Sequence, residues 1–182
     1  WASGWRGWCC VAEATRPGRV VEAVVSTQLL RSALGRFASG VTLVTCRAAD
    51  GTPVGLTVNS FAALSLQPPL VLWSLRHASP SLQAFRSSRH FAVNVLAQDQ
   101  LALSRRFASR ISDKFAQGEW MSGRAGVPVL AGCAAVFECA TASAQPAGDH
   151  ILFIGRVLAA SASALAPLVF QAGHYRKLGE IL

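Results

Sequence analysis

Acidic residues and lysines are both scarce in this sequence of 182 residues. Asp and Glu number 9 against 17 Lys and Arg, which gives a formal net charge of +8. Lys114 and Lys177 are the only lysines, so the positive charge comes almost entirely from arginine. Because a guanidinium binds phosphate through two parallel hydrogen bonds, we expect an anionic ligand. No paired carboxylates occur at a spacing that would suit a glycosidase.

Several familiar catalytic and nucleotide motifs are missing. The sequence contains no G-x-G-x-x-G, no G-x-S-x-G and no H-E-x-x-H. Residues 35–42 have the glycine spacing of a phosphate-binding loop, but Val41 stands where that loop needs its lysine. The five cysteines form no C-x-x-C pair and are odd in number, so neither a disulfide framework nor a metal site is predicted. Rossmann, hydrolase and metalloenzyme classes are therefore disfavoured.

No stretch has the character of a membrane span or a signal peptide. Residues 51–75 carry no formal charge, but polar side chains and Pro68-Pro69 divide them into pieces of strand length. Residues 1–25 show neither a periodic pattern nor a continuous apolar run. We expect residues 1–25 to be a disordered or artefactual extension and residues 26–182 to form one cytoplasmic domain.

Strand-like segments outnumber helical ones. Apolar periodicity and capping residues predict helices at 27–37, 79–87 and 99–107. Strands are predicted at 41–46, 54–60, 70–75, 91–96, 133–143, 151–161, 168–170 and 175–177. Asp50-Gly51 is typical of a hairpin turn, and residues 111–127 of a long surface loop or lid. Short turn-linked strands with few helices favour an antiparallel barrel.

Small hydroxyl and amide side chains gather at the ends of the predicted strands. They are Thr57, Asn59, Ser60, Ser74 and Ser81, accompanied by Arg76, Arg105 and Arg106. Taken alone, such residues are most often turn and cap groups. The sequences around these residues support a binding role for them.

Six segments occur in one order along the chain: FASGVT at 37–42, GLTVNSF at 55–61, LSLQPPL at 64–70, FAVNVL at 91–96, SRRF at 104–107 and GDH at 148–150. This series closely resembles the flavin reductase-like family, the short-chain NAD(P)H:flavin oxidoreductases that supply two-component monooxygenases. The resemblance extends from about residue 29 to residue 179, which is essentially the whole domain.

The resemblance implies a mainly β fold, an antiparallel FMN-binding split β-barrel with a few peripheral helices, usually assembled as a homodimer. It implies reduction of FMN or FAD by NADH or NADPH through direct hydride transfer, with a monooxygenase as the possible partner and no role for nucleic acid or membrane. Two alternatives remain open from the residues. One is a flavin-binding split-barrel protein that is not a reductase, either oxidase-like or a flavin carrier. The other is a basic small-barrel protein that binds nucleic acid.

The resemblance also assigns site residues. The segment beside the flavin ring corresponds to Pro53, Val54, Gly55, Leu56, Thr57, Asn59 and Ser60. The ribityl chain and phosphate are assigned to Ser74, Leu75, Arg76, Pro80 and Ser81, and a second phosphate and ring-side contact to Arg106 and Phe107. His150 is the one predicted catalytic residue, as a contact to flavin or nicotinamide. Tyr175 belongs to a tail in which the family pattern H-x-G-x-Y becomes QAGHY, so nicotinamide binding there has less support than flavin binding.

Overall fold

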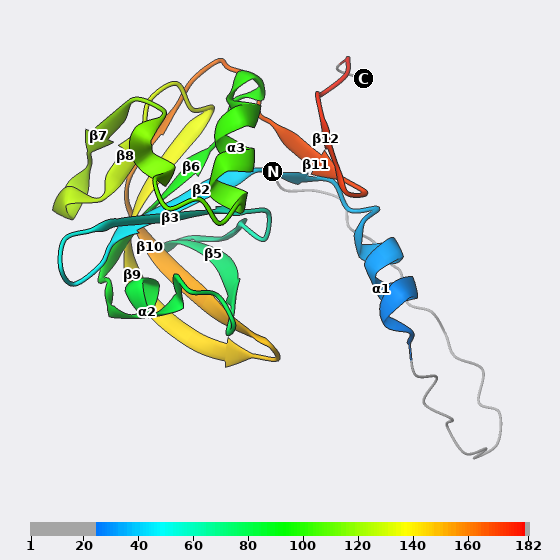
Figure 1. Cartoon of the computed structure of the whole chain (residues 1–182), viewed down its shortest axis with the longest axis horizontal. Helices are drawn as coiled ribbons and strands as arrows, with labels where there is room; N and C mark the ends of the chain where they lie inside the picture. The colour runs from blue at the N-terminus through cyan, green and yellow to red at the C-terminus, as the bar shows by residue number, and fades with distance from the viewer. Residues whose placement is uncertain (1–24, 181–182) are drawn as a thin grey trace.

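The computed structural model describes residues 25–180 (Figure 1), so the predicted extension lies outside this range except for its last residue. The α-helices are α1 (Thr27–Leu34), α2 (Leu82–Ser87) and α3 (Leu101–Ala108). The strands are β1 (Ser39–Gly40), β2 (Thr42–Arg47), β3 (Pro53–Val58), β4 (Ala62–Leu66), β5 (Pro69–Arg76), β6 (His90–Val95), β7 (Trp120–Ser122), β8 (Pro128–Leu130), β9 (Ala135–Ala147), β10 (His150–Ala162), β11 (Val169–Gln171) and β12 (His174–Arg176). Short 3₁₀ turns occupy Gln98–Gln100, Lys114–Ala116 and Arg124–Gly126.

One curved seven-stranded sheet forms the body of the molecule (Figure 1). Its strand order is β3-β2-β6-β9-β10-β5-β4, and each neighbouring pair is antiparallel. Strands β3 and β4 end the order, so the barrel is open between them. A three-stranded sheet of β1, β11 and β12 and the β7-β8 pair lie beside it. The prediction of a mainly β, antiparallel fold with a few helices is confirmed.

The first helix differs from its prediction. Ser26 caps α1 as expected, with its Oγ accepting from the amide of Leu29 at 3.2 Å. The helix ends at Leu34 rather than at residue 37, because the next amides form tighter i→i−3 bonds: Arg36 donates to the carbonyl of Ala33 at 3.0 Å and Phe37 to that of Leu34 at 3.1 Å. No residue of α1 is buried, and Phe37 is 80% exposed. The apolar side chains that predicted a core-facing helix thus face away from the core of their own chain.

Three further elements differ from the sequence-based predictions. The expected loop at 111–127 contains β7 and two 3₁₀ turns, and β7 pairs with β8. Strand β4 was not predicted because it is an exposed edge strand without an alternating pattern. Strand β9 begins at Ala135 rather than at residue 133, so Cys133 lies outside the strand that carries Cys139, and the two thiols lie in separate cores.

The seven-stranded sheet has a hydrophobic cluster on each face, since neighbouring strand residues such as Leu43 and Val44 belong to different clusters. In the first, the Trp73 indole stacks on Phe153 with ring centroids 4.6 Å apart and contacts Phe91 edge-on. Gly155 permits this packing, since a Cβ there would lie 2.4 Å from Phe91. The second cluster contains Phe107 and lies below α3 and β8. Trp73 is fully buried, and its ring anchors the sheet that carries the site.

Buried polar groups fasten β8 to the barrel. The side-chain amide of Asn94 donates to the carbonyl of Leu43 at 3.0 Å and accepts from the amide of Leu130 at 2.9 Å. Thr45 donates to the carbonyl of Pro128 at 2.6 Å. These bonds satisfy backbone groups that would otherwise be buried without partners. Within residues 25–180, no helix combines the length and hydropathy that a bilayer crossing requires, and no cluster of His, Cys, Asp or Glu is arranged as a metal site.

Candidate functional site

A continuous groove follows strand β3. Two cavities of about 520 and 650 Å³ meet at Leu56, Thr57, Ser79 and Arg110, which line both. A smaller apolar cavity of about 190 Å³ continues from Thr57 to Tyr175, and another of about 160 Å³ lies at the Pro53 end of the strand. The groove is therefore long enough and wide enough for an extended ligand of nucleotide size.

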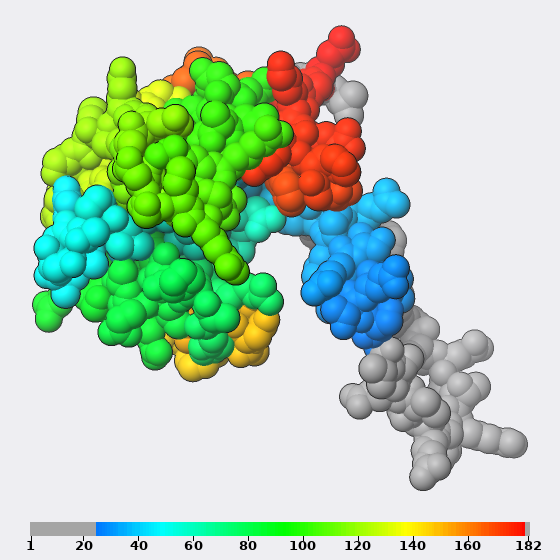
Figure 2. All heavy atoms as spheres, in the orientation of Figure 1, coloured from blue at the N-terminus to red at the C-terminus, as the bar shows by residue number. Residues whose placement is uncertain are grey.

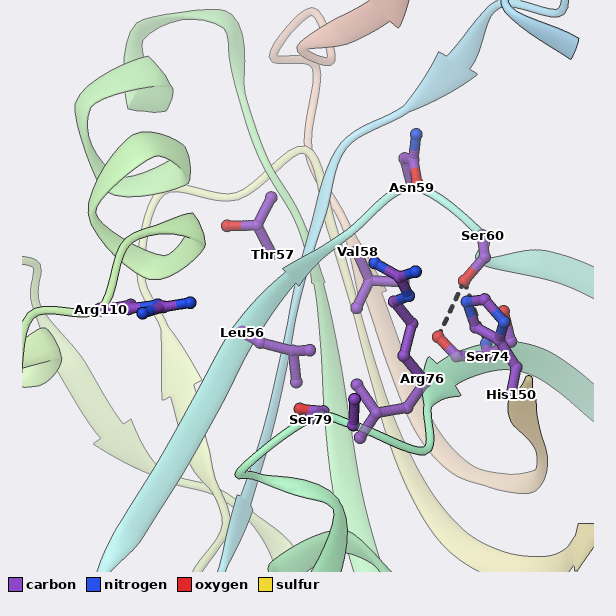
Figure 3. Close-up of a pocket in the computed structure, with 12 residues that line it drawn as sticks. Leu56, Thr57, Val58, Asn59, Ser60, Ser74, Arg76, Ser79, Arg110 and His150 are labelled. Carbon is purple, nitrogen blue, oxygen red and sulfur yellow. Dashed lines mark hydrogen bonds between the residues drawn. The ribbon is translucent and has the colours of Figure 1, made fainter. Parts of the chain in front are cut away.

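One side of the groove, here called the strand wall, consists of β3 with the residues that follow it, the end of β5 and the start of β10. Ser60 ties β3 to β5, since its Oγ accepts from the amide of Ser74 at 3.0 Å and lies 3.2 Å from the carbonyl of the same residue. Figure 3 shows this pair beside His150. Thr57 donates to the carbonyl of Ser104 at 2.6 Å and so joins β3 to α3. The strand wall is held by backbone pairing and by short side chains.

His150 and Arg76 stand opposite each other at the end of the strand wall, where the register pairs them across β10 and β5. Asp149 contacts both: its carboxylate is 2.7 Å from Nδ1 of His150 and 3.8 Å from the guanidinium of Arg76. The hydrogen bond to His150 holds the pKa of the Asp149 carboxyl below its ordinary value. Because Asp149 engages Nδ1, Nε2 is the imidazole nitrogen left for a ligand in the groove.

The opposite side, here called the loop wall, comprises the last turn of α3 and residues 109–116. Arg106 Nε donates to the carbonyl of Lys114 at 3.0 Å, and a terminal nitrogen of Arg106 donates to the carbonyl of Asp113. In return, Lys114 Nζ donates to the carbonyl of Phe107 at 2.9 Å. Burial lowers the pKa of the Lys114 ammonium. The loop wall is thus held by long cationic side chains on backbone carbonyls.

Positive groups line both walls. Arg76 belongs to the strand wall, and Arg110 and Lys114 belong to the loop wall. No Asp or Glu occurs among the described residues that line the four cavities. An anion is therefore favoured along the whole groove, while serine and threonine hydroxyls supply neutral donors and acceptors.

All but one of the site residues predicted from the sequence line this groove. They are Pro53, Val54, Gly55, Leu56, Thr57, Asn59, Ser60, Ser74, Leu75, Arg76, Pro80, Ser81, Phe107, His150 and Tyr175. Arg106 lines none of the four cavities and instead binds the loop backbone. Packing within the protein explains why residue 55 is a glycine, because a Cβ there would lie 2.8 Å from the Phe107 ring.

The sequence interpretation missed several lining residues. These are Val41, Val58, Ala78, Ser79, Ala108, Ser109, Arg110, Ile111, Ser112, Lys114, Phe115 and Phe170. Most lie on the loop wall, of which residues 111–116 belong to the segment predicted as a long surface loop or lid and were given no role. The sequence did contain a signal in Arg110 and Lys114. Two cations that closely follow a predicted helix are candidates for contact with an anion.

Comparison with known proteins gives a consistent result. Residues 34–179 match the family model described as "Flavin reductase like domain". The chain is 45% identical over 150 residues to "FMN reductase (NADH) SmoA" of Agrobacterium fabrum, covering 82% of this chain and 85% of the relative. It is 41% identical over 166 residues to the reductase subunit HsaB of a flavin-dependent monooxygenase of Rhodococcus jostii, covering 91% of this chain and 85% of the relative.

Solved structures give the same picture. The NADH:FAD oxidoreductase SgcE6 of Streptomyces globisporus, in complex with NAD and FAD fragments, superposes with a TM-score of 0.79 at 36% identity, covering 84% of this chain and 92% of that chain. The chain spans about half the length of some curated relatives, such as 49% of the "Probable flavin reductase" of Rhizobium meliloti.

Proposed function

The chain belongs to the flavin reductase-like family, and on that basis we propose that it catalyses the reduction of FMN or FAD by NADH or NADPH. Relatives named as an NADH-dependent FMN reductase and as the reductase subunit of a monooxygenase support this activity over flavin carriage or nucleic-acid binding. The reduced flavin then serves a partner monooxygenase. A cytoplasmic location and a single domain over residues 26–182 stay predictions.

The observation that carries the proposal is the groove along β3. Its cations fit the phosphate of a flavin nucleotide, its hydroxyls fit a ribityl chain, and the apolar cavity toward Tyr175 fits part of a planar ring. When bound, flavin and nicotinamide supply the redox chemistry, in which a hydride passes from one to the other. The residues of this chain have to bind and orient two rings and exclude water, which agrees with the absence of paired carboxylates in the lining.

His150 is proposed to contact the flavin or the nicotinamide. It lines the groove, and Asp149 fixes its ring through Nδ1 at 2.7 Å. A neutral imidazole held in this way presents Nε2 as an acceptor, and a protonated one presents it as a donor. In either state the ring can orient a carbonyl, amide or ring nitrogen of a bound cofactor without taking part in proton transfer.

A homodimer, implied by the resemblance, is supported by α1. Figure 2 shows this helix standing clear of the barrel, and Leu29, Leu30 and Leu34 are 62%, 47% and 64% exposed. An isolated helix of eight residues is marginal in water, so its apolar face requires a surface to bury it. A second copy of the chain is the proposed surface. Light scattering coupled to gel filtration should give twice the monomer mass.

Four assays test the activity. Purified protein is mixed with FMN or FAD and with NADH or NADPH, and the absorbance of the reduced nicotinamide is followed. We expect this absorbance to fall with at least one pair. Flavin binding without nicotinamide oxidation in any pair would indicate the flavin carrier instead. A protein that binds no flavin at all would contradict both readings.

A further inference from the structure

The loop wall carries four cations, which are not equivalent. Arg105 lies over the ring of Tyr175, with its guanidinium carbon 5.9 Å from the ring centroid, and lines none of the four cavities. Arg106 and Lys114 are half-buried and donate to backbone carbonyls, whereas Arg110 is exposed. Within residues 25–180, Arg110 makes no ion pair and its side chain donates no hydrogen bond. Yet Arg110 lines both of the larger cavities of the groove. It is the loop-wall cation that is free to bind a ligand.

Arg106 and Lys114 hold the two ends of the loop wall together through hydrogen bonds from their side chains to backbone carbonyls. Arg106 reaches from α3 to the carbonyls of Asp113 and Lys114, and Lys114 reaches back to the carbonyl of Phe107 at 2.9 Å, with the carbonyl of Gly55 at 3.5 Å. The carbonyls at the end of α3 carry the negative end of the helix dipole, which suits the ammonium of Lys114. Both ends of the segment from Phe107 to Lys114 are therefore fixed, with Arg110 between them.

Two guanidinium groups face the groove from opposite walls. In Figure 3, Arg110 enters from the loop after α3 and Arg76 from the end of β5, with β3 passing between them. Arg76 has one weak partner, the exposed carboxylate of Asp149 at 3.8 Å. Two guanidinium groups without a carboxylate in the lining are suited to a phosphate, which accepts hydrogen bonds on several oxygens at once.

We propose that Arg110 binds the phosphate of the flavin nucleotide, and that Arg106 and Lys114 are positioning residues that hold Arg110 in place. This inference rests on the proposed function, and it replaces the direct phosphate contact that the resemblance assigned to Arg106. A cation on a fixed loop binds a ligand more tightly than the same cation on a mobile loop, because a mobile loop loses conformational entropy when the ligand binds. Replacing Arg106 or Lys114 should therefore weaken phosphate binding, although neither side chain contacts the phosphate.

Titrations with FMN and riboflavin, followed by flavin fluorescence, test the role of Arg110. A charge-assisted hydrogen bond contributes about 1.5–3 kcal/mol, so Arg110→Ala should weaken FMN binding about ten- to a hundredfold. Riboflavin, which lacks the phosphate, should bind the variant within about twofold of the wild type. Arg86→Ala is the matched control, because Arg86 is an exposed arginine of α2 that does not line the groove.

A double-mutant cycle tests the positioning role of Arg106. If Arg106 acts through Arg110, Arg106→Ala should weaken FMN but not riboflavin, and adding it to Arg110→Ala should cause no further loss of FMN affinity. Additive losses in the cycle would show that Arg106 binds the phosphate directly and would overturn its positioning role. Equal losses of FMN and riboflavin affinity in Arg110→Ala would overturn the inference while the proposed function stands. A wild-type protein that binds neither flavin would overturn the proposed function, and the inference with it.

Discussion

The two walls of the groove are built in different ways. The strand wall is part of the seven-stranded sheet, and its residues are placed by register: Ser74 pairs with Leu152, and Arg76 pairs with His150. The loop wall has no such ladder, and its shape depends on Arg106 and Lys114, whose long side chains donate to nearby carbonyls. Backbone pairing resists local change because many bonds must break together, while a loop held by two side chains can be released by one substitution.

This difference predicts where a substitution acts. Changes behind the strand wall should unfold the protein, because the same aromatic core supports the whole sheet. Substitution of Arg106 or Lys114, which hold the loop wall, should alter ligand binding and leave the free energy of unfolding nearly unchanged.

Truncation of Trp73 should have the largest effect. The indole is fully buried and stacks on Phe153, so Trp73→Ala should lower the free energy of unfolding by about 3–5 kcal/mol. Urea denaturation followed by circular dichroism measures this loss. Arg106→Ala provides the contrast and should change the free energy of unfolding by less than about 1 kcal/mol. Similar losses in the two variants would show that the walls do not differ in this way.

A methyl group at Gly55 should disturb both walls together. A Cβ there would lie 2.8 Å from the Phe107 ring, so Gly55→Ala should force β3 and α3 apart and cost about 1–3 kcal/mol of stability. Gly40→Ala is the matched control, since a Cβ at Gly40 meets nothing within 4 Å. Thermal denaturation compares the two. If the Gly55 and Gly40 variants melt at the same temperature, the close approach of Phe107 to β3 is not what requires a glycine.

Removal of the His150 side chain should have a moderate kinetic effect. If the residues only orient two stacked rings, His150→Ala should raise KM for the nicotinamide or lower kcat by about tenfold without abolishing turnover. The rate of flavin reduction should then vary little between about pH 6 and 8 in the wild type. Stopped-flow measurements across this range check both points. A pH-dependent step in the wild-type rate that disappears in the variant would instead show that His150 transfers a proton.

The smallest expected effect is a difference in alkylation rate between the buried thiols of Cys133 and Cys139. Burial raises the pKa of Cys133 and of Cys139 to about 12, so neither should react readily with iodoacetamide in the native state at about pH 8. Cys139 lies in the core behind the strand wall and Cys133 in the core below the loop wall. If the loop wall opens more easily, Cys133 should be alkylated a few times faster than Cys139, as mass spectrometry of the labelled peptides would measure. Faster labelling of Cys139 would contradict the comparison.

The same thiols give a pH dependence with a definite sign. Their folded pKa values lie above the ordinary value of 9.0, so the folded protein keeps protons that the unfolded chain releases. Their contribution to stability is complete below about pH 9 and is lost as the pH rises toward about 12. Urea midpoints measured between these values should decrease steadily, and a constant midpoint would show that the thiols are not buried.

Local pattern was sufficient for most of the strand wall. β-Branched runs and Asp50-Gly51 predicted an antiparallel barrel, because alternation and turn chemistry act between neighbours in the chain. The small polar residues at the strand ends, such as Thr57, Asn59 and Ser60, were candidates that on their own are most often turn and cap groups. The resemblance of six ordered segments then assigned these residues to a flavin. The structure brings these residues together along one groove and places His150 beside Arg76.

Only the tertiary structure decided the rest. The free face of α1 has the same amphipathic pattern as a core-facing helix, and periodicity cannot tell which surface will cover it. The exchange of roles between Arg106 and Arg110 could not be read from the sequence either, because both are arginines of one basic segment. Their difference arises where the chain turns after α3 and brings the carbonyls of Asp113 and Lys114 within reach of Arg106, which leaves Arg110 facing the groove.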